Sequence, residues 1–421
     1  MQMRMSWGAV MLNKLRELWS DRRGNALIIA AGALPLIIGS AGLASDTIQW
    51  TLWKRQLQRA ADSAAISGAY ARIEGTSASD AVTTDLTKNN QLWVPLLSGY
   101  PQTTTPANTT TWSHQVQVVL AVQQKLGFSS VFISTPPMIT ATAKAAAVDD
   151  GAFCVVSLEH SSDPGITIQG STTTNLGCGA ISDSIAVTTS VNTNGAAYNF
   201  ASSIVAAVGG LPATITGSAN LQPYHLAQPD PYEGLDTSVP SGTSCTNFNS
   251  HIVSTSGSVT TISPGCYNSW DKNGNYAMQP GTYYLNNTDF DRTGNGTLTG
   301  TGVTIVLTGS NPGTVKTNGT SSINLSAPTT GAFAKILIAQ STAAGVDNNN
   351  TINGTNSSTY DGALYFPKGL INFTGTTGAI SKCLMVVSKK VNFAGNSNIQ
   401  NDVNGCTANT TVTGKKIRLV A

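Results

Sequence analysis

The stretch RRGNALIIAAGALPLIIGSAGLASD, residues 22–46, decides how the rest of the chain is built. From Ala26 to Leu43 it carries no charged residue, and a run of this length is near the lower limit for a helix that spans a bilayer. Pro35 lies inside the run, which membrane helices tolerate because other groups satisfy the freed backbone carbonyl. The stretch therefore predicts a membrane-spanning helix near the N-terminus.

The charges that precede this run predict its orientation. Basic residues outnumber acidic ones there: Arg4, Lys14, Arg16, Arg22 and Arg23 stand against Glu17 and Asp21. Positive residues are retained on the cytoplasmic side of a membrane. Residues 1–23 are therefore expected to form a cytoplasmic tail, and the chain after Asp46 is expected on the opposite side.

A cleaved signal peptide is the alternative to a permanent anchor. Gly42 and Ala44 offer the small-x-small pattern that a signal peptidase recognises. The apolar core of a signal peptide is shorter than this run, however. The helical pattern also continues past the site through TIQWTLWKRQLQRAADSAAISGAYARI, residues 47–73. Both features favour an anchor.

The continuing helix has two distinct faces. One face carries small and apolar residues, namely Leu57, Ala60, Ala61, Ala64, Ala65, Gly68 and Ala69. The other face carries Arg55, Arg59 and Asp62. The pattern predicts one helix of roughly 45 residues, about 70 Å long, half of it in lipid. We expect the small-residue face to pack closely on partner helices of a membrane machinery.

These features in combination resemble the N-terminal segment of TadE/TadG-like Flp pilus-assembly proteins. The resemblance rests on the Arg-Arg-Gly entry, the apolar run with one proline, the small-residue exit with Asp46, and LQRAADSAAISGAY. Members that are cut by prepilin peptidase carry a glutamate five residues after the leader glycine. Here Gly24 would be that glycine, but Ile29 occupies the glutamate position. The resemblance thus implies an uncleaved, TadG-like protein, with processing at Gly24 as the alternative.

Composition limits the remaining possibilities. The 421 residues suffice for two or three domains, and only 10% of them are charged, with a net charge of +2. No basic stripe alternates with aromatic residues, so nucleic-acid binding is not expected. Abundant Thr, Ser, Asn and Gly are common in exported β-proteins.

Residues 74–148 are expected to form a small pilin-like α+β region. A short helix is predicted over Asp80–Asn90, with Ser77 or Ser79 as its cap. Alternating SHQVQVVLAVQQ predicts a strand, and VFISTPPMITATAKAAAV offers two more, separated by Pro136 and Pro137.

Residues 149–421 are expected to be mainly β, because short β-prone runs alternate with Gly, Asn and Ser turns. The one stretch that looks helical is NFASSIVAAVGG. A sandwich, a barrel or a β-solenoid all fit such spacing, and the recurring Asn and Thr corners favour the solenoid. The stretches SPGCY, PGTYYL, GTGVTIVLTG and DGALYFP also resemble the right-handed parallel β-helix that many TadG-like proteins carry.

Six cysteines lie in this second part: Cys154, Cys178, Cys245, Cys266, Cys383 and Cys406. None forms a Cys-x-x-Cys pair, so a zinc site is not expected. Taken two by two along the chain, these cysteines are 24, 21 and 23 residues apart, which is about the length of one coil of a three-faced solenoid. The two cysteines of each pair would therefore stack on adjacent coils. We therefore expect structural disulfides Cys154–Cys178, Cys245–Cys266 and Cys383–Cys406, and an oxidising compartment.

Three acidic groups are candidate catalytic or metal sites. Asp289 and Asp291 lie on the same side of a strand in TDFDRT, with Arg292 beside them. Polysaccharide-active β-helices need clustered carboxylates, but a solvated turn is the favoured interpretation. DKNGNY resembles a calcium loop, but its glycine is at the fourth position rather than the sixth. QPDPYEGLD is broken by proline and is expected to be a connector. No catalytic residue, metal ligand or cofactor is expected.

Together these features predict a non-enzymatic, single-pass protein of the bacterial inner membrane with its C-terminal domain in the periplasm. The family resemblance implies a role in Flp/Tad pilus assembly, with other pilus-assembly proteins, and possible cell-wall or outer-membrane components, as partners. The alternative is a surface-exposed adhesin or carbohydrate-binding solenoid. A β-helix enzyme that uses Asp289 and Asp291 is a further alternative.

Overall fold

The computed structural model describes most of the chain. The described residues are 22–89, 92–170, 173–194, 198–201, 204–216, 220–318, 320–353, 358–374, 380–394, 398–402, 406 and 411–420. Nearly all of the expected cytoplasmic tail lies outside them. The chain divides into two compact units. Unit 1 comprises Met1–Val148 and Ile417–Ala421, and unit 2 comprises Asp149–Lys416. The last residues of the chain thus belong to unit 1, whereas the sequence predicts that they share a domain with residues 149–416.

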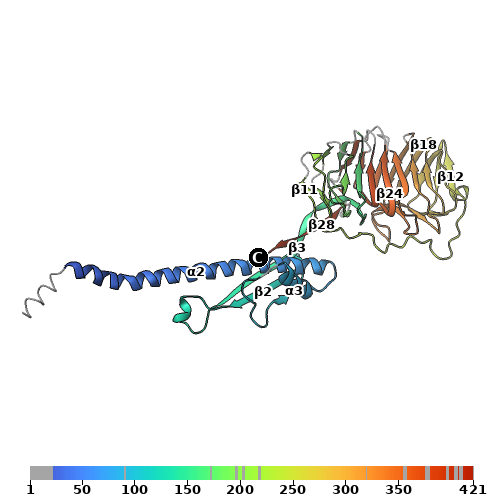
Figure 1. Cartoon of the computed structure of the whole chain (residues 1–421). Helices are drawn as coiled ribbons and strands as arrows, with labels where there is room; N and C mark the ends of the chain where they lie inside the picture. The colour runs from blue at the N-terminus through green and yellow to red at the C-terminus, as the bar shows by residue number, and fades with distance from the viewer. Residues whose placement is uncertain are drawn as a thin grey trace, which may run out of the picture. The chain divides into compact units, whose positions relative to one another are not determined.

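Unit 1 is built on one long helix, α2, which spans Arg22–Ile73 and includes Pro35 (Figure 1). Its first half is apolar and exposed, with Ile29, Leu36 and Ile37 all facing away from the protein. The helix is long and apolar enough to cross a membrane. Exposed apolar side chains on half of a helix are what lipid, rather than water, would cover.

The second half of α2 packs on a small α+β layer. Helix α3 spans Ala78–Lys88 and is capped by Ser77, whose side chain accepts a hydrogen bond from the amide of Asp80. The strands are β1 (Gln102–Thr104), β2 (Ser113–Gln123) and β3 (Met138–Ser157). Strand β2 pairs antiparallel with both β1 and β3.

Two elements expected from the sequence, a strand in unit 1 and a helix in unit 2, are not formed. The residues before Pro136 form no strand, since Ser129–Val131 is a short 3₁₀ helix, η1. NFASSIVAAVGG forms strands β8 and β9 rather than a helix, because Val205 and Ala206 are buried by pairing with β6. Tertiary packing overrides helix propensity there.

Unit 2 consists almost entirely of short strands. From the N-terminal side they are β4 (Ile166–Ile168), β5 (Thr173–Asn175), β6 (Gly179–Ser182), β7 (Val191–Asn192), β8 (Tyr198–Ala201), β9 (Ile204–Ala207), β10 (Ile215–Thr216) and β11 (Asn220–Gln222). After a connector and the 3₁₀ helix η2 (Phe248–His251) come β12 (Ile252–Ser256), β13 (Val259–Ile262), β14 (Gly265–Tyr267), β15 (Asn275–Met278), β16 (Gly281–Asn286), β17 (Phe290–Arg292), β18 (Gly296–Thr301), β19 (Val303–Thr308) and β20 (Val315–Thr317). The remainder are β21 (Ser321–Ser326), β22 (Ile336–Gln340), β23 (Asn348–Asn353), β24 (Thr359–Thr374), β25 (Ile380–Lys382), β26 (Leu384–Phe393), β27 (Asn398–Asp402) and β28 (Val412–Leu419).

Pairing between these strands is mainly parallel and follows a repeat of three. Strands β15, β16 and β17 pair with β18, β19 and β20 respectively. Those strands in turn pair with β21, β22 and β23. Alternate residues face a shared apolar interior: Leu298 on β18 and Ile323 on β21 pair directly, and both are buried. The unit is thus a large, parallel-rich β domain.

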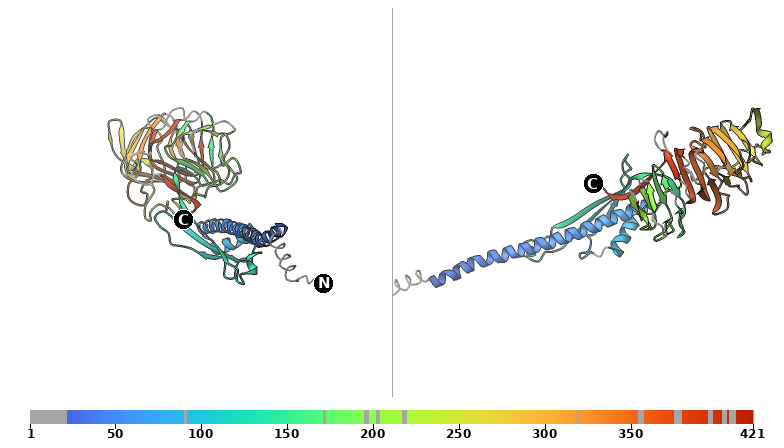
Figure 2. Two further views of the ribbon diagram at one scale, coloured as in Figure 1. Left: turned by 90° about the vertical axis from the view of Figure 1, so that its left-hand side faces the viewer. Right: turned by 90° about the horizontal axis from the view of Figure 1, so that it is seen from above.

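The order of strands in this stack is not the order of the sequence. Strands β3, β6, β9 and β11 pair in succession, and β14, β16, β19, β22, β24 and β26 form a second succession. The two successions join where β26 pairs with β3, with Val386 opposite Val155. Figure 2 shows the result by colour: green strands lie next to red ones, and orange and yellow strands follow. The chain therefore enters the stack in its middle, at a place we call the junction.

Candidate functional site

The exit of the apolar half of α2 is held by a buried carboxylate. Oδ1 of Asp46 accepts a hydrogen bond from the amide of Phe128 at 3.0 Å. Its Oδ2 accepts from both the amide and the hydroxyl of Ser129. Asp46 is only 4% exposed, so these bonds replace the water that a carboxylate otherwise requires. We call this arrangement the Asp46 latch.

Close packing accompanies the latch. A Cβ atom at position 42 would collide with the ring of Phe128, so glycine permits the tip of the β2–β3 hairpin to approach the helix. Figure 1 shows this hairpin running alongside α2. In the sequence, Asp46 and Gly42 are notable only as members of the segment that ends the apolar run. It gave no signal for their partner, which lies more than 80 residues further along the chain.

The small-residue face of α2 is buried inside unit 1. Its members contact β2, β3 and α3: Leu57, Ala60, Ala61, Ala64, Ala65, Gly68 and Ala69. A Cβ at Gly68 would lie 2.9 Å from Val116 on β2 and 3.1 Å from Val82 on α3. The expectation that this face contacts partner helices is therefore wrong, because the chain's own sheet already covers it.

The acidic residues that the sequence offers as catalytic candidates are engaged in local structure. Asp289 accepts hydrogen bonds from Thr314 and pairs with Lys316 at 2.5 Å. Asp291 bonds the amide and hydroxyl of Thr293, two residues away. Arg292 is fully buried, and its guanidinium donates to main-chain carbonyls such as that of Gly274, at 2.8 Å. This geometry is that of turns that connect stacked strands.

The other two acidic candidates also serve the fold. Asp271 accepts from the amide of Asn273 and from the hydroxyl of Tyr276 at 2.5 Å. Asp230 accepts from the hydroxyl of Tyr365 at 2.8 Å and thus attaches the connector to β24. Among the described residues, no group of three or more His, Cys, Asp or Glu side chains is placed to hold a metal ion.

A charged cluster lies at the junction. Lys389 and Lys390 lie on β26, directly after the residues that pair with β3, and each places its Nζ near Oε2 of Glu159, at 3.4 and 3.5 Å. Lys390 also pairs with Asp163 at 3.0 Å, and both lysines pair with Asp347. Three carboxylates from two loops thus converge on two adjacent lysines.

The protonation of this cluster follows from its contacts. Burial alone would raise the pKa of Glu159, but hydrogen bonds from Ser161 and the charge of Lys389 lower that pKa below its ordinary value. Burial would likewise lower the pKa of Lys390, but Asp163 and Asp347 raise it above its ordinary value. Glu159 and Lys390 are therefore charged at neutral pH, and the cluster ties β26 to the loop after β3.

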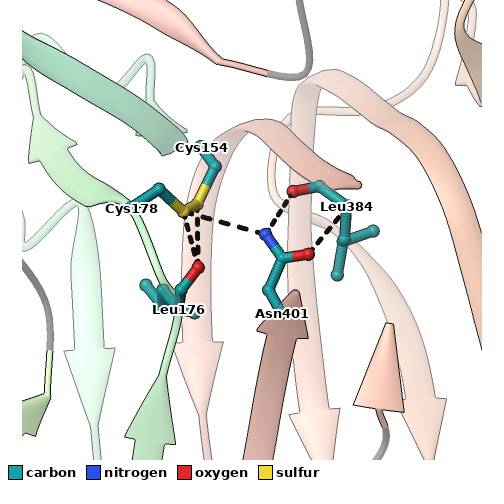
Figure 3. The surroundings of a disulfide bond; sticks show 5 residues. All are labelled: Cys154, Leu176, Cys178, Leu384 and Asn401. Carbon is teal, nitrogen blue, oxygen red and sulfur yellow. Dashed lines mark hydrogen bonds between the residues drawn. A yellow bond between two sulfur atoms is a disulfide. The ribbon is translucent and has the colours of Figure 1, made fainter. Parts of the chain in front are cut away.

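A disulfide and an amide form a second link at the junction (Figure 3). Cys154 on β3 is bonded to Cys178 before β6. The side chain of Asn401 on β27 accepts from the amide of Leu384 and donates to its carbonyl, both at 2.9 Å, and it also contacts Sγ of Cys178. The remaining disulfides are Cys245–Cys266 and Cys383–Cys406. These pairs coincide with those expected from the intervals in the sequence.

Comparison with known proteins identifies only the N-terminal helix. Residues 24–71 match the family described as putative Flp pilus-assembly TadE/G-like. This match confirms the resemblance of the anchor and the helix that follows it. Unit 2 lies outside the matched segment. No curated protein and no solved structure matches the chain.

Proposed function

We propose that the chain is a non-enzymatic, single-pass inner-membrane component of Flp/Tad-type pilus assembly. The observation that carries the proposal is the family match over residues 24–71, which coincides with the apolar half of α2 and its packed continuation. The engaged carboxylates of unit 2 support a structural role over a catalytic one. Other pilus-assembly proteins are the proposed partners.

The proposed topology places the N-terminus in the cytoplasm and unit 2 in the periplasm. Basic residues precede the apolar run, which favours retention of that end in the cytoplasm. Three disulfides in unit 2 favour an oxidising compartment for the rest of the chain.

We further propose that the strand stack of unit 2 is a right-handed parallel β-helix that serves as a rigid anchoring module. Parallel pairing with a repeat of three strands supports this assignment, since each turn of such a helix contributes one strand to each of three faces. A stiff module on a membrane-anchored stalk would suit contact with the cell wall or with outer-membrane components.

Piliation of the source bacterium tests the main proposal. Deletion of the coding sequence should abolish surface pili, and the full chain should restore them. A chain with Leu36→Arg and Ile37→Arg should fail to restore them, because charge at the centre of a span opposes insertion. Thr109→Arg with Thr110→Arg, on an exposed loop of unit 1, is the matched control. Normal piliation after deletion would overturn the proposal.

A second candidate function is glycan binding by unit 2. Asn324, Ser326, Thr359 and Asp361 line an open groove across β21 and β24 and offer hydroxyl, amide and carboxylate groups. The intact mass of the membrane-extracted chain helps to separate the two functions. A retained Met1 supports the anchor, whereas a chain that begins near Ser45 or Asn25 favours a released adhesin or a pilin-like subunit.

A further inference from the structure

The tip of the β2–β3 hairpin exposes a cluster of large apolar side chains. Val131 is 75% exposed, Phe132 is 74% exposed and Ile133 is 52% exposed. We call these three residues the apolar tip. Water-exposed loops are usually polar, so three consecutive exposed apolar residues on a loop indicate a surface that something covers.

The Asp46 latch fixes the height of this tip along α2. Asp46 binds the amides of Phe128 and Ser129, and Gly42 receives the ring of Phe128. The uncharged run of α2 ends at Ser45, three residues beyond Gly42 and directly before Asp46. The tip is therefore held at the end of the membrane-spanning run, where the hydrocarbon core meets the headgroups.

The backbone of the tip is prepared for an environment with little water. The amides of Phe128 and Ser129 donate to Asp46, and those of Ser130, Val131, Phe132 and Ile133 donate to carbonyls of Leu126, Phe128 and Ser129. Six consecutive amides are thus satisfied within the protein. A backbone that enters lipid must have its amides hydrogen-bonded within the protein, whereas an amide in water can bond to the solvent.

Charge near the tip is also compatible with a membrane surface. No acidic residue occurs between Asp85 and Asp149, and Lys125 is an exposed cation at the base of the tip. Lysine beside an apolar segment favours contact with anionic headgroups. A protein partner with an apolar groove is the other conceivable occupant, but continuity with the lipid-facing run favours the bilayer.

We propose that the apolar tip inserts into the outer leaflet of the inner membrane as a second anchor beside α2. The inference rests on the proposal that α2 spans that membrane. Two points of attachment would fix the tilt and rotation of unit 1 relative to the bilayer, which a single helix leaves free.

Fluorescence quenching in lipid vesicles tests the inference. The full chain, with its disulfides intact, is reconstituted with one added cysteine that carries an environment-sensitive fluorophore. Phe132→Cys probes the tip, Leu36→Cys probes the spanning run, and Thr110→Cys probes an exposed loop at the far end of β2. The label at position 132 should be quenched by nitroxide lipids as at position 36 and be protected from iodide. Position 110 should show the reverse.

The outcomes separate the two proposals. Quenching by lipid at position 36 but by iodide at position 132 would overturn the second anchor and leave the spanning helix intact. Protection of position 132 from both quenchers would show that protein, such as a second copy of this chain, covers the tip, and would also overturn the inference. Exposure of position 36 to iodide would show that α2 does not span the bilayer, and the proposed function would fail with it.

Discussion

The carboxylate of Asp46 links α2 to a loop more than 80 residues further along the chain. It satisfies two backbone amides and one hydroxyl at a single point. Buried donors that lose their acceptor cost more free energy than the bond itself contributes. This residue therefore has a larger effect on unit 1 than its position at the end of an apolar run suggests.

Asp46→Ala should release the β2–β3 tip from the helix. Loss of the acceptor is expected to lower the local free energy of opening by about 1–3 kcal/mol. Hydrogen exchange at the amides of Phe128 and Ser129 measures this change in the detergent-solubilised full chain. Asp62→Ala is the matched control, since the side chain of Asp62 accepts a hydrogen bond from Gln58 on its own helix. Unchanged exchange at both amides would contradict the latch.

Asp183 predicts a pH dependence of the stability of unit 2. It lies after β6, is fully buried, and accepts a hydrogen bond from the amide of Gln228 on the connector at 2.9 Å. Burial raises the pKa of Asp183 to about 7, although the Gln228 bond opposes the rise. A folded-state pKa above the unfolded value means that stability falls as the pH rises from about 4 through 7.

Asp183→Asn should remove that fall, because an amide resembles the protonated carboxyl. The variant is expected to exceed the parent in stability at about pH 8 by at most about 4 kcal/mol, and to match it near pH 4. Thermal unfolding of both chains across this range measures the difference. Parallel pH profiles for parent and variant would show that the carboxylate stays solvated.

Individual contacts of this kind could not be predicted from the sequence. The spacing of cysteines gave the disulfide pairs because a repeating coil places residues one period apart in contact. Asp46 and Ser129 are not related by any sequence repeat, and Asp183 and Gln228 meet only because the connector folds back. Periodic patterns carry information on contacts within a repeat, and none on contacts outside it.

At the scale of elements, α2 followed most directly from the sequence. An uncharged run and a continuous helical pattern gave its existence, its approximate length and its small-residue face. The sequence could not say what covers that face. Alanine and glycine permit close approach of any backbone, whether it belongs to a partner helix or, as found, to β2 and β3.

Ala64→Leu tests how tightly this face is packed. Ala64 is fully buried, so extra methyl groups must displace the sheet, at a cost of about 1–3 kcal/mol. Faster hydrogen exchange throughout β2 is the expected result. Arg59→Leu adds apolar volume on the exposed face and should leave exchange in β2 unchanged. Equal effects of the two variants would indicate that the helix and sheet are loosely packed.

At the scale of the whole molecule, the order of the stack was beyond the reach of sequence patterns. The short β-prone runs have similar composition, so any of them could pair with any other. They therefore predict a stack of strands but not the spatial order of the strands in it. In the structure β26 lies against β3, with the remaining strands on either side. The free edges of the stack are therefore internal strands of the sequence, and the chain enters and leaves near the middle.

This topology makes the junction the place where two separately wound parts of unit 2 must dock. Strand β26 pairs there over two stretches, with Val386–Ser388 opposite Val155–Ser157 of β3 and Val391–Phe393 opposite Ile166–Ile168 of β4. Lys389 and Lys390, between these two stretches, are each less than one quarter exposed, and the side chain of Glu159, which both contact, is 4% exposed. The charged cluster thus adds specificity to a docking step that apolar strands alone would leave imprecise.

Lys389→Met with Lys390→Met should weaken that docking. It leaves the carboxylate of Glu159 buried without a counter-charge, at an expected cost of about 3–5 kcal/mol. Amides of β3 and β26 at the junction should then exchange with deuterium faster than those of β16 and β19. Lys316→Met is the matched control, because its partner Asp289 is at the surface and such pairs contribute about 0–1 kcal/mol. If the double variant and the control exchange alike at β26, strand pairing alone holds the two parts of the stack together.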